Sequence, residues 1–232
     1  MSTDSSFSHN FHSCSHCALH FLCENSRYKL IVHTSTLKRK ESLYSYMDPF
    51  TSTYAVRSGA IKTYHVDIEG NERINQFYLA GELLGFEAIS LNHYPFSAMA
   101  IVDTTLCHLS YKRLLEYISA FPQGYSTILE KVTKRFNYGQ YLTLHTSEQR
   151  VASFLLEFSQ RVQMKEDNPE FDMIIPRQDI GHYLGLAPET ISRLFLRLQQ
   201  ARLIKVSNKK IKLLNVARLK SIIQNSSCII QP

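Results

Sequence analysis

The residues of this chain best suited to metal or redox chemistry are cysteines. Cys14, Cys17 and Cys23 fall within ten residues of one another near the N-terminus. The segment around them is polar and lacks apolar periodicity, so residues 1–27 are predicted to form a cysteine-bearing arm that needs a tie to the folded protein. Cys107 lies far along the chain, on a predicted strand. Together these four thiols provide such a tie.

Four thiolates meet the ligand demand of a [2Fe–2S] or a cubane iron–sulfur cluster. An odd number of cysteines in a chain without a secretory signal argues against a disulfide framework. Two alternatives stay open. One is a four-cysteine zinc site, although the five-residue gap between Cys17 and Cys23 is unusual for zinc. The other is a thiol–disulfide switch between Cys107 and an arm cysteine. Cys228 matches no pattern and is predicted to be a spare thiol.

Positive charge is concentrated at the C-terminal end of the chain. From Met173 onward there are ten Lys or Arg and two acidic residues, a net +8, so a total of +6 leaves the preceding residues at −2. A basic segment on a near-neutral body is typical of a protein that binds a polyanion. No apolar run approaches the ~20 residues of a membrane span, and the N-terminus does not resemble a secretory signal. A cytoplasmic protein that does not insert into membranes is expected.

Residues 176–200 are predicted to form a helix-turn-helix. The first helix is expected over Arg177–Leu184, and Gly185 suits the left-handed residue that ends a helix. Pro188 suits the first position of the second helix. Ala187 precedes it at the N-cap, where it offers no side-chain oxygen to the free N–H groups. The apolar residues of the second helix recur at helical spacing and are expected to be buried: Ile191, Leu194, Phe195 and Leu198.

Side chains off that buried stripe are the candidates for contact with double-stranded DNA. A helix in the major groove reads base edges with its first two turns. Arg193 can offer two donors to a guanine, and Glu189 can accept from a cytosine amine. The segment Leu203–Leu214 alternates around a Ser-Asn turn and is predicted to form a hairpin wing whose lysines follow the phosphate backbone. The complete predicted set is Glu189, Thr190, Ser192, Arg193, Arg197, Lys209 and Lys210.

The preceding residues, 28–121, are predicted to form a small β-sandwich or barrel. Short alternating runs are broken by a turn at Ser58-Gly59 and by a hairpin around Gly70. Short strands of this kind at regular spacing are typical of such folds. This unit is the candidate sensor domain.

The period becomes helical after Tyr111. Residues 122–146 are predicted to form a helix of about 20 residues that suits a connecting rod or a dimer seam. Ser147–Val162 is a second amphipathic helix, with Ser147 as its candidate cap, and residues 165–170 are expected to be a polar loop. Residues 147–232 would then be the DNA-binding domain.

These segments together resemble the Crp/Fnr family of regulators. In the fumarate and nitrate reduction (Fnr) branch, a Glu-x-x-Ser-Arg pattern marks the reading helix, and here it spans 189–193. The similarity continues in Tyr54–Tyr64 and Phe77–Ile89. The resemblance implies an α+β fold. This comprises an N-terminal β-roll like the cyclic-nucleotide-binding jelly roll, a long dimerisation helix and a C-terminal winged helix-turn-helix.

The same resemblance implies a function. It indicates an oxygen-responsive transcription regulator, not an enzyme, that acts as a homodimer on TTGAT-type palindromic sites. It also implies that a [4Fe–4S] cluster controls dimerisation, with Cys14, Cys17, Cys23 and Cys107 as its ligands. Activation implies contact with RNA polymerase. Gly85 and Glu87 are the candidate contacts, because the loop Gly85–Pro95 resembles the family region that touches the polymerase.

Several positions depart from the family pattern. Tyr94–Ser97 lacks the arginine with which cyclic-nucleotide receptors hold the cyclic phosphate, so no cyclic nucleotide is expected. A metal-dependent β-roll enzyme is the remaining alternative, but His65, His93 and His108 are too scattered to suggest a ligand set. Turn glycines are replaced near Lys40 and Asp48. The segment 136–142 lacks the acidic residue that opposes pairing in the family, so a dimer that persists without a cluster is also open.

Overall fold

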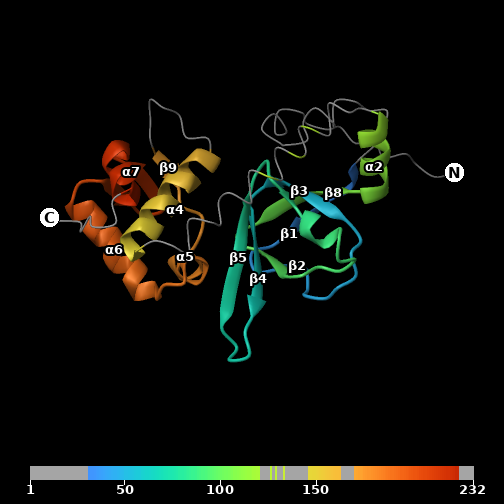
Figure 1. The fold of residues 1–232 in the computed structure, drawn as a ribbon, viewed down its shortest axis with the longest axis horizontal. Coiled ribbons are helices and arrows are strands. Elements are labelled where there is room, and N and C mark those ends of the chain that lie inside the picture. The colour runs from blue at the N-terminus through green and yellow to red at the C-terminus, as the bar shows by residue number, and fades with distance from the viewer. Residues whose placement is uncertain are drawn as a thin grey trace.

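The computed structural model describes residues 31–120, 126, 129, 133, 146–162 and 170–224. They form an N-terminal β-roll and a C-terminal domain of helices with a small sheet (Figure 1). Cys14, Cys17, Cys23, Cys228 and nearly all of the predicted dimerisation helix lie outside the described residues. Within those ranges, no helix is both long and apolar enough to span a bilayer.

The β-roll consists of two antiparallel four-stranded sheets. Their order is β1-β8-β3-β6 in one sheet and β2-β7-β4-β5 in the other. A 3-10 helix, η3 (Phe86–Ala88), follows β6, and α2 (Tyr111–Ala120) follows β8. The strands are β1 (Ile31–Leu37), β2 (Ser42–Tyr44), β3 (Thr53–Ser58), β4 (Ala60–Val66), β5 (Glu72–Leu79), β6 (Leu83–Leu84), β7 (Ser97–Ala100) and β8 (Thr104–Leu109).

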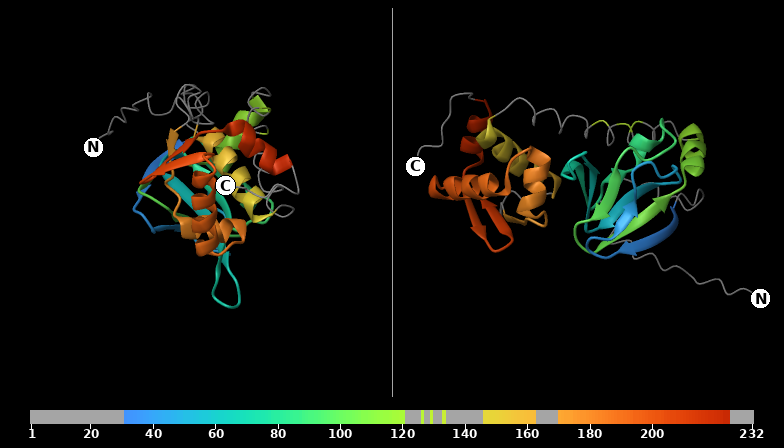
Figure 2. Two further views of the ribbon diagram at one scale, coloured as in Figure 1. Left: turned by 90° about the vertical axis from the view of Figure 1, so that its left-hand side faces the viewer. Right: turned by 90° about the horizontal axis from the view of Figure 1, so that it is seen from below.

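The predicted turns of the roll are confirmed. Gly59 joins β3 to β4 with a φ of 87°, and a Cβ there would lie 2.4 Å from the Thr104 hydroxyl oxygen, so only glycine fits. Asp67 through Asn71 close the β4–β5 hairpin, which projects from the body of the molecule (Figure 2). Lys40 and Met47 both have a φ of 69°. Non-glycine residues therefore adopt the left-handed conformation at or beside the positions where the sequence lacks the expected turn glycines.

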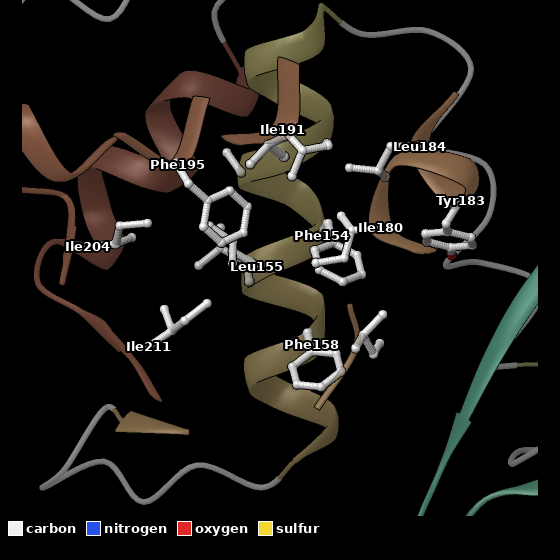
Figure 3. Close-up of a cluster of buried hydrophobic side chains, with 14 of the residues drawn as sticks. Phe154, Leu155, Phe158, Ile180, Tyr183, Leu184, Ile191, Phe195, Ile204 and Ile211 are labelled. Atoms are coloured by element: carbon white, nitrogen blue, oxygen red, sulfur yellow. The ribbon is translucent and has the colours of Figure 1, made fainter. Parts of the chain in front are cut away.

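The C-terminal domain is a winged helix-turn-helix. Its elements are α4 (Ser147–Arg161), β9 (Glu170–Asp172), α5 (Arg177–Leu184), α6 (Pro188–Gln200), β10 (Ile204–Ser207), β11 (Lys210–Leu213) and α7 (Val216–Gln224). Phe154 and Leu155 of α4 face the buried side of α6, where Ile191 and Phe195 lie (Figure 3). This packing buries the apolar stripe that the sequence predicted.

Two details of the C-terminal prediction are wrong. The cap of α4 is Thr146, and Ser147 is already helical. Thr146 and Gln149 form a reciprocal capping box, in which each side chain accepts from the other's backbone N–H. Glu170 begins strand β9 and pairs with Lys212 of the wing, so it does not belong to a loop. A three-residue strand is too short to show a recognisable alternation of apolar and polar residues. It forms here because it pairs with a strand that is distant in the sequence.

The two domains share a continuous apolar core. Phe77 of β5 is fully buried. Its ring centroid lies 5.0 Å from that of Tyr183 on α5 and 6.4 Å from that of Phe154 on α4. Tyr183 lies on the side of the C-terminal domain that faces the β4–β5 hairpin (Figure 3).

Candidate nucleic-acid interface

The tight turn between α5 and α6 positions the candidate reading helix. Gly185 ends α5 with a φ of 65°, as the sequence predicted. The Leu186 N–H donates to the Gly181 carbonyl oxygen at 2.9 Å. A Cβ on Gly181 would lie 2.6 Å from the Leu186 carbonyl oxygen, which is closer than any side chain allows. The angle between the two helices therefore depends on the absence of a side chain at this position.

The outer face of α6 is open. Glu189, Ser192 and Arg193 are exposed, and Thr190 is half-buried beside them. The Arg193 guanidinium donates to the Thr190 hydroxyl oxygen at 3.1 Å, which holds the arginine over the first turn of the helix. Ala187 is the N-cap and makes no side-chain cap bond, as predicted from the sequence. The face thus presents one cation, one carboxylate and two hydroxyls within two turns, which is the chemistry needed to read base edges.

Three further candidates for DNA contact have different surroundings. Arg197 is half-buried and donates to the Glu148 carboxylate at 2.9 Å. Lys210 donates to the Glu170 carboxylate at 3.1 Å, and this contact raises the pKa of Lys210. Lys209 is exposed beside it at the tip of the β10–β11 wing. Phosphate contacts by Arg197 and Lys210 would therefore replace contacts within the chain.

Cys107 lies in the middle of a sheet of the β-roll. It pairs with Thr34 on β1 and with Ala55 on β3, and its side chain is buried. The adjacent Leu106 packs into the core of the roll. Because side chains alternate along a strand, Cys107 is directed to the opposite face of the sheet. A cluster ligand there would face outward from the roll.

The candidate polymerase contacts lie at the end of the first sheet. Gly85 is buried and has a φ of 86°, so it allows the left-handed turn before η3 and offers no side chain for a contact. Glu87 is half-buried, and its carboxylate accepts from the Tyr78 hydroxyl at 3.5 Å.

The interior of the β-roll is filled by stacked tyrosines. The rings of Tyr44 and Tyr94 stack at 3.8 Å, and the Tyr94 hydroxyl donates to the Ser52 carbonyl oxygen at 2.7 Å. Burial raises the pKa of Tyr44, and it also raises the pKa of Tyr54 next to it. These side chains therefore stay neutral, and they occupy the core of the roll as packing residues.

His108 lies at one edge of this aromatic cluster. Its ring stacks on that of His33 at 3.8 Å, and its Nε2 lies 2.7 Å from the Ser35 hydroxyl oxygen. Burial, followed by the proximity of His33, lowers the pKa of His108 to about 4. The ring is therefore neutral near pH 7.

In the described part of the chain, one group of side chains has the composition of a metal site. The ligand atoms of Glu72, Asp179 and His182 lie within 4.8 Å of one another, between the β-roll and α5. However, the Lys62 ammonium donates to both carboxylates. A lysine thus already supplies the positive charge that a metal ion would bring. This group was not predicted from the sequence. The one indication was Lys62, because a charged residue inside a predicted strand needs a partner of opposite charge.

Comparisons with known proteins agree with this geometry. A cyclic nucleotide-binding domain matches residues 34–121, and a Crp-like helix-turn-helix domain matches residues 149–222. The chain is 33% identical to the transcriptional activator protein anr of Pseudomonas aeruginosa over 220 residues, which cover 89% of this chain and 90% of that protein. It is 35% identical to the fumarate and nitrate reduction regulatory protein of Vibrio cholerae over 196 residues, which cover 82% and 78%.

A solved structure has the same fold. FixK2 from Bradyrhizobium japonicum superposes with a TM-score of 0.72 at 26% identity, covering 82% of this chain and 96% of that one. The α+β architecture of β-roll and helix-turn-helix is thereby confirmed. The matching relatives are transcription regulators and not enzymes.

Proposed function

Because the chain belongs to the Crp/Fnr family of transcription regulators, we propose that it is an oxygen-responsive activator that binds TTGAT-type palindromic sites as a homodimer. The observation that carries the proposal is the exposed Glu189, Ser192 and Arg193 on α6. Their side chains are free to meet base edges, while the opposite face of the helix is buried against α4. The same residues form the Glu-x-x-Ser-Arg pattern of the Fnr branch.

DNA is engaged by the helix and the wing together. Arg193 supplies a bidentate donor that suits a guanine, and Glu189 supplies an acceptor that suits a cytosine amine. The exposed Lys209 adds a charge for the phosphate backbone. A dimer would place two such helices about one DNA turn apart. A dimer that binds both half-sites at once has a much higher affinity for DNA than a single DNA-binding domain.

Four thiolates support the oxygen-sensing part of the proposal. Cys14, Cys17, Cys23 and Cys107 would hold a [4Fe–4S] cluster, which supplies oxygen-sensitive redox chemistry when bound. The position of Cys107 fits this role, because its side chain leaves the core of the roll and lies on the opposite sheet face. A cluster held there by Cys107 would fix the cysteine-bearing arm, residues 1–27, against this face of the sheet.

Activation also requires a partner. RNA polymerase is the proposed partner, and Glu87 on η3 is the candidate contact, because the carboxylate of this half-buried residue lies next to an irregular surface loop. Gly85 supports this contact through its left-handed backbone conformation.

Anaerobic purification tests the proposal. We expect a brown protein with an iron-to-sulfide ratio of about one, and loss of both colour and specific DNA binding when the same sample meets air. Cys107→Ser should abolish the colour, whereas Cys228→Ser, the matched control, should retain it. A colourless anaerobic protein that holds zinc would contradict the cluster assignment. Sedimentation before and after air decides whether loss of the cluster gives monomers.

A further inference from the structure

The face of β5 that meets the C-terminal domain carries three polar contacts as well as the apolar core. At its start, Glu72 accepts from the ammonium of Lys62 on the neighbouring strand β4, and the same ammonium donates to Asp179 of α5. Near its middle, the Tyr183 hydroxyl donates to the Gln76 side-chain oxygen at 3.3 Å. Beyond its end, the Arg161 guanidinium of α4 makes two bonds to the Glu82 carboxylate, at 2.8 and 2.9 Å. These three contacts define the β5 interface.

Their spacing determines how much freedom the C-terminal domain retains. A strand of eight residues is about 27 Å long, and the contacts lie at its start, its middle and beyond its end. Apolar packing alone favours burial without fixing direction. Hydrogen bonds and ion pairs depend on direction, so contacts this far apart define an orientation as well as an area.

The Lys62 contact lies in a cleft that Pro188, the first residue of α6, also lines. Lys62 is 7% exposed, and its ammonium lies between the carboxylates of Glu72 and Asp179. His182, one turn further along α5, lies with its Nδ1 3.8 Å from the Glu72 carboxylate. Removing one partner of such a group leaves the others without their counter-charge. The cluster thus favours one register of α5 on the β-roll.

The position of α5 determines that of α6. The Gly181 carbonyl oxygen of α5 accepts from the Leu186 N–H in the turn, and a Cβ on this glycine would lie 3.7 Å from the carbonyl carbon of Ala187, the N-cap of α6. Both Leu186 and Ala187 line the cleft between the domains, together with Lys62 and Asp179. In this docked arrangement Glu189, Ser192 and Arg193 remain exposed. Docking therefore leaves the reading face open.

From this geometry we propose that the Lys62–Glu72–Asp179 cluster is an orientation lock. It holds the helix-turn-helix on the β-roll of its own chain in the arrangement that binds DNA. Each chain of the dimer then presents α6 at a set angle. Regulation would then act on the pairing of two chains that are each internally rigid. This inference rests on the proposed function, since it takes DNA as the ligand of α6.

A charge-exchange experiment tests the lock. Lys62→Glu places three carboxylates together, and Asp179→Lys places two lysines beside one carboxylate, so each single variant should undock α5. The double variant Lys62→Glu/Asp179→Lys again has one lysine and two carboxylates. Gln178→Lys is the control, because it also introduces a lysine into the first turn of α5 but at an exposed position outside the cluster.

Two measurements are made on each variant. Amide hydrogen exchange over residues 180–184 reports docking directly, and binding to duplex DNA with two TTGAT-type half-sites reports function. If undocking leaves each reading helix correctly oriented about a third of the time, both helices of a dimer are correct only about a tenth of the time. The affinity of the dimer for DNA then falls about tenfold. We expect both single variants to exchange faster and to bind about tenfold more weakly. The double variant and Gln178→Lys should match the wild type in both measurements.

Two results would overturn the proposal. One is a single variant that exchanges faster at α5 but binds DNA as tightly as the wild type or more tightly, since docking would then be incidental or inhibitory. The other is unchanged exchange in both single variants, since the cluster would then not hold α5. A wild-type protein that fails to bind the duplex would refute the proposed function instead, and the exchange measurements would still test the docking.

Discussion

At the scale of single residues, the reading face of α6 combines exposure with order. Arg193 is exposed, yet its guanidinium bonds to the Thr190 hydroxyl one turn earlier. A preorganised arginine loses less side-chain entropy on binding than a free one. Arg197 and Lys210 instead have carboxylate partners within the chain, so we expect their net contribution to DNA affinity to be smaller than that of Arg193. The three positively charged side chains are therefore not equivalent.

Replacing Arg193 by Ala should weaken binding to the specific site by about 1–3 kcal/mol and relax the preference for one base pair. Of the three exposed residues Glu189, Ser192 and Arg193, only the arginine can donate twice to a guanine. Competition binding with half-sites changed at each position in turn measures both effects. Lys209→Ala, the control, should weaken binding to all sequences alike and reduce the salt dependence. Unchanged specific affinity in Arg193→Ala would mean that α6 does not read the site in this way.

His108 should make the folded state sensitive to acid. Its pKa is about 4 in the folded protein, against about 6.5 in an unfolded chain. Between these values the unfolded state binds more protons, so stability rises with pH across this window and is lost as pH falls toward 4. After allowance for solvent screening at this half-buried ring, the loss is about 1–2 kcal/mol.

Urea unfolding at several pH values checks this prediction. His108→Gln should flatten the stability profile between pH 6.5 and pH 4, whereas the same change at the exposed His65 should leave the slope as it is. An unchanged slope in His108→Gln would show that other groups cause the acid sensitivity.

At the scale of elements, the start of α6 lacks a feature that the start of α4 has. Thr146 and Gln149 satisfy the first backbone donors of α4 through a capping box. Ala187 offers α6 no such acceptor, although its extended backbone has the conformation of an N-cap. Glu189 in the first turn compensates in part, because a carboxylate interacts favourably with the positive end of the helix dipole.

The substitution Ala187→Ser should stabilise the protein by about 1 kcal/mol by providing the missing acceptor. Chemical unfolding measures the change. Ala201→Ser is a suitable control, because the C-terminal end of α6 has no free N–H groups for the new hydroxyl to accept from. Equal effects of the two serines would show that capping is not the cause.

At the scale of the whole molecule, the β-roll and the helix-turn-helix form one packed body. The β4–β5 hairpin runs alongside the C-terminal domain and projects past it (Figure 2). The Arg161 side chain is 5% exposed and bonds to Glu82 of the β-roll and to Glu157 of its own helix. It also donates to the Phe77 carbonyl oxygen at 2.7 Å. The neighbouring carboxylates raise the pKa of Arg161 against the effect of burial, so its charge is retained.

Arg161→Met should destabilise the folded protein by about 3–5 kcal/mol, because it leaves carboxylates without their counter-charge at a buried interface. The additional change Glu82→Met should recover much of this loss, since apolar replacement of both partners removes the uncompensated charge. Lys38→Ala breaks an exposed pair with Asp103 and should change stability by less than about 1 kcal/mol. Similar losses in Arg161→Met and Lys38→Ala would show that the interface does not depend on the buried arginine.

The local features of the reading head could be predicted from sequence because each depends on neighbouring residues. Gly185 and Pro188 mark the ends of the two helices, and helical spacing alone identifies the stripe that includes Ile191. The β4–β5 hairpin follows in the same way from alternation around Gly70. Resemblance added the family, which the comparisons confirm. The four-cysteine site and its cluster remain predictions, because Cys14, Cys17 and Cys23 lie outside the described residues.

What the sequence by itself determined about this protein is therefore its elements, the buried and exposed faces of α6, and its family. Only the tertiary structure decided how the two domains meet. Lys62 and Asp179 lie 117 residues apart, and no periodicity or spacing relates them. Their contact exists because β5 and α5 bury a shared apolar surface, and the charges can then pair at its edge. Local patterns encode which face of an element is buried, whereas the partner of that face depends on the packing of the whole chain.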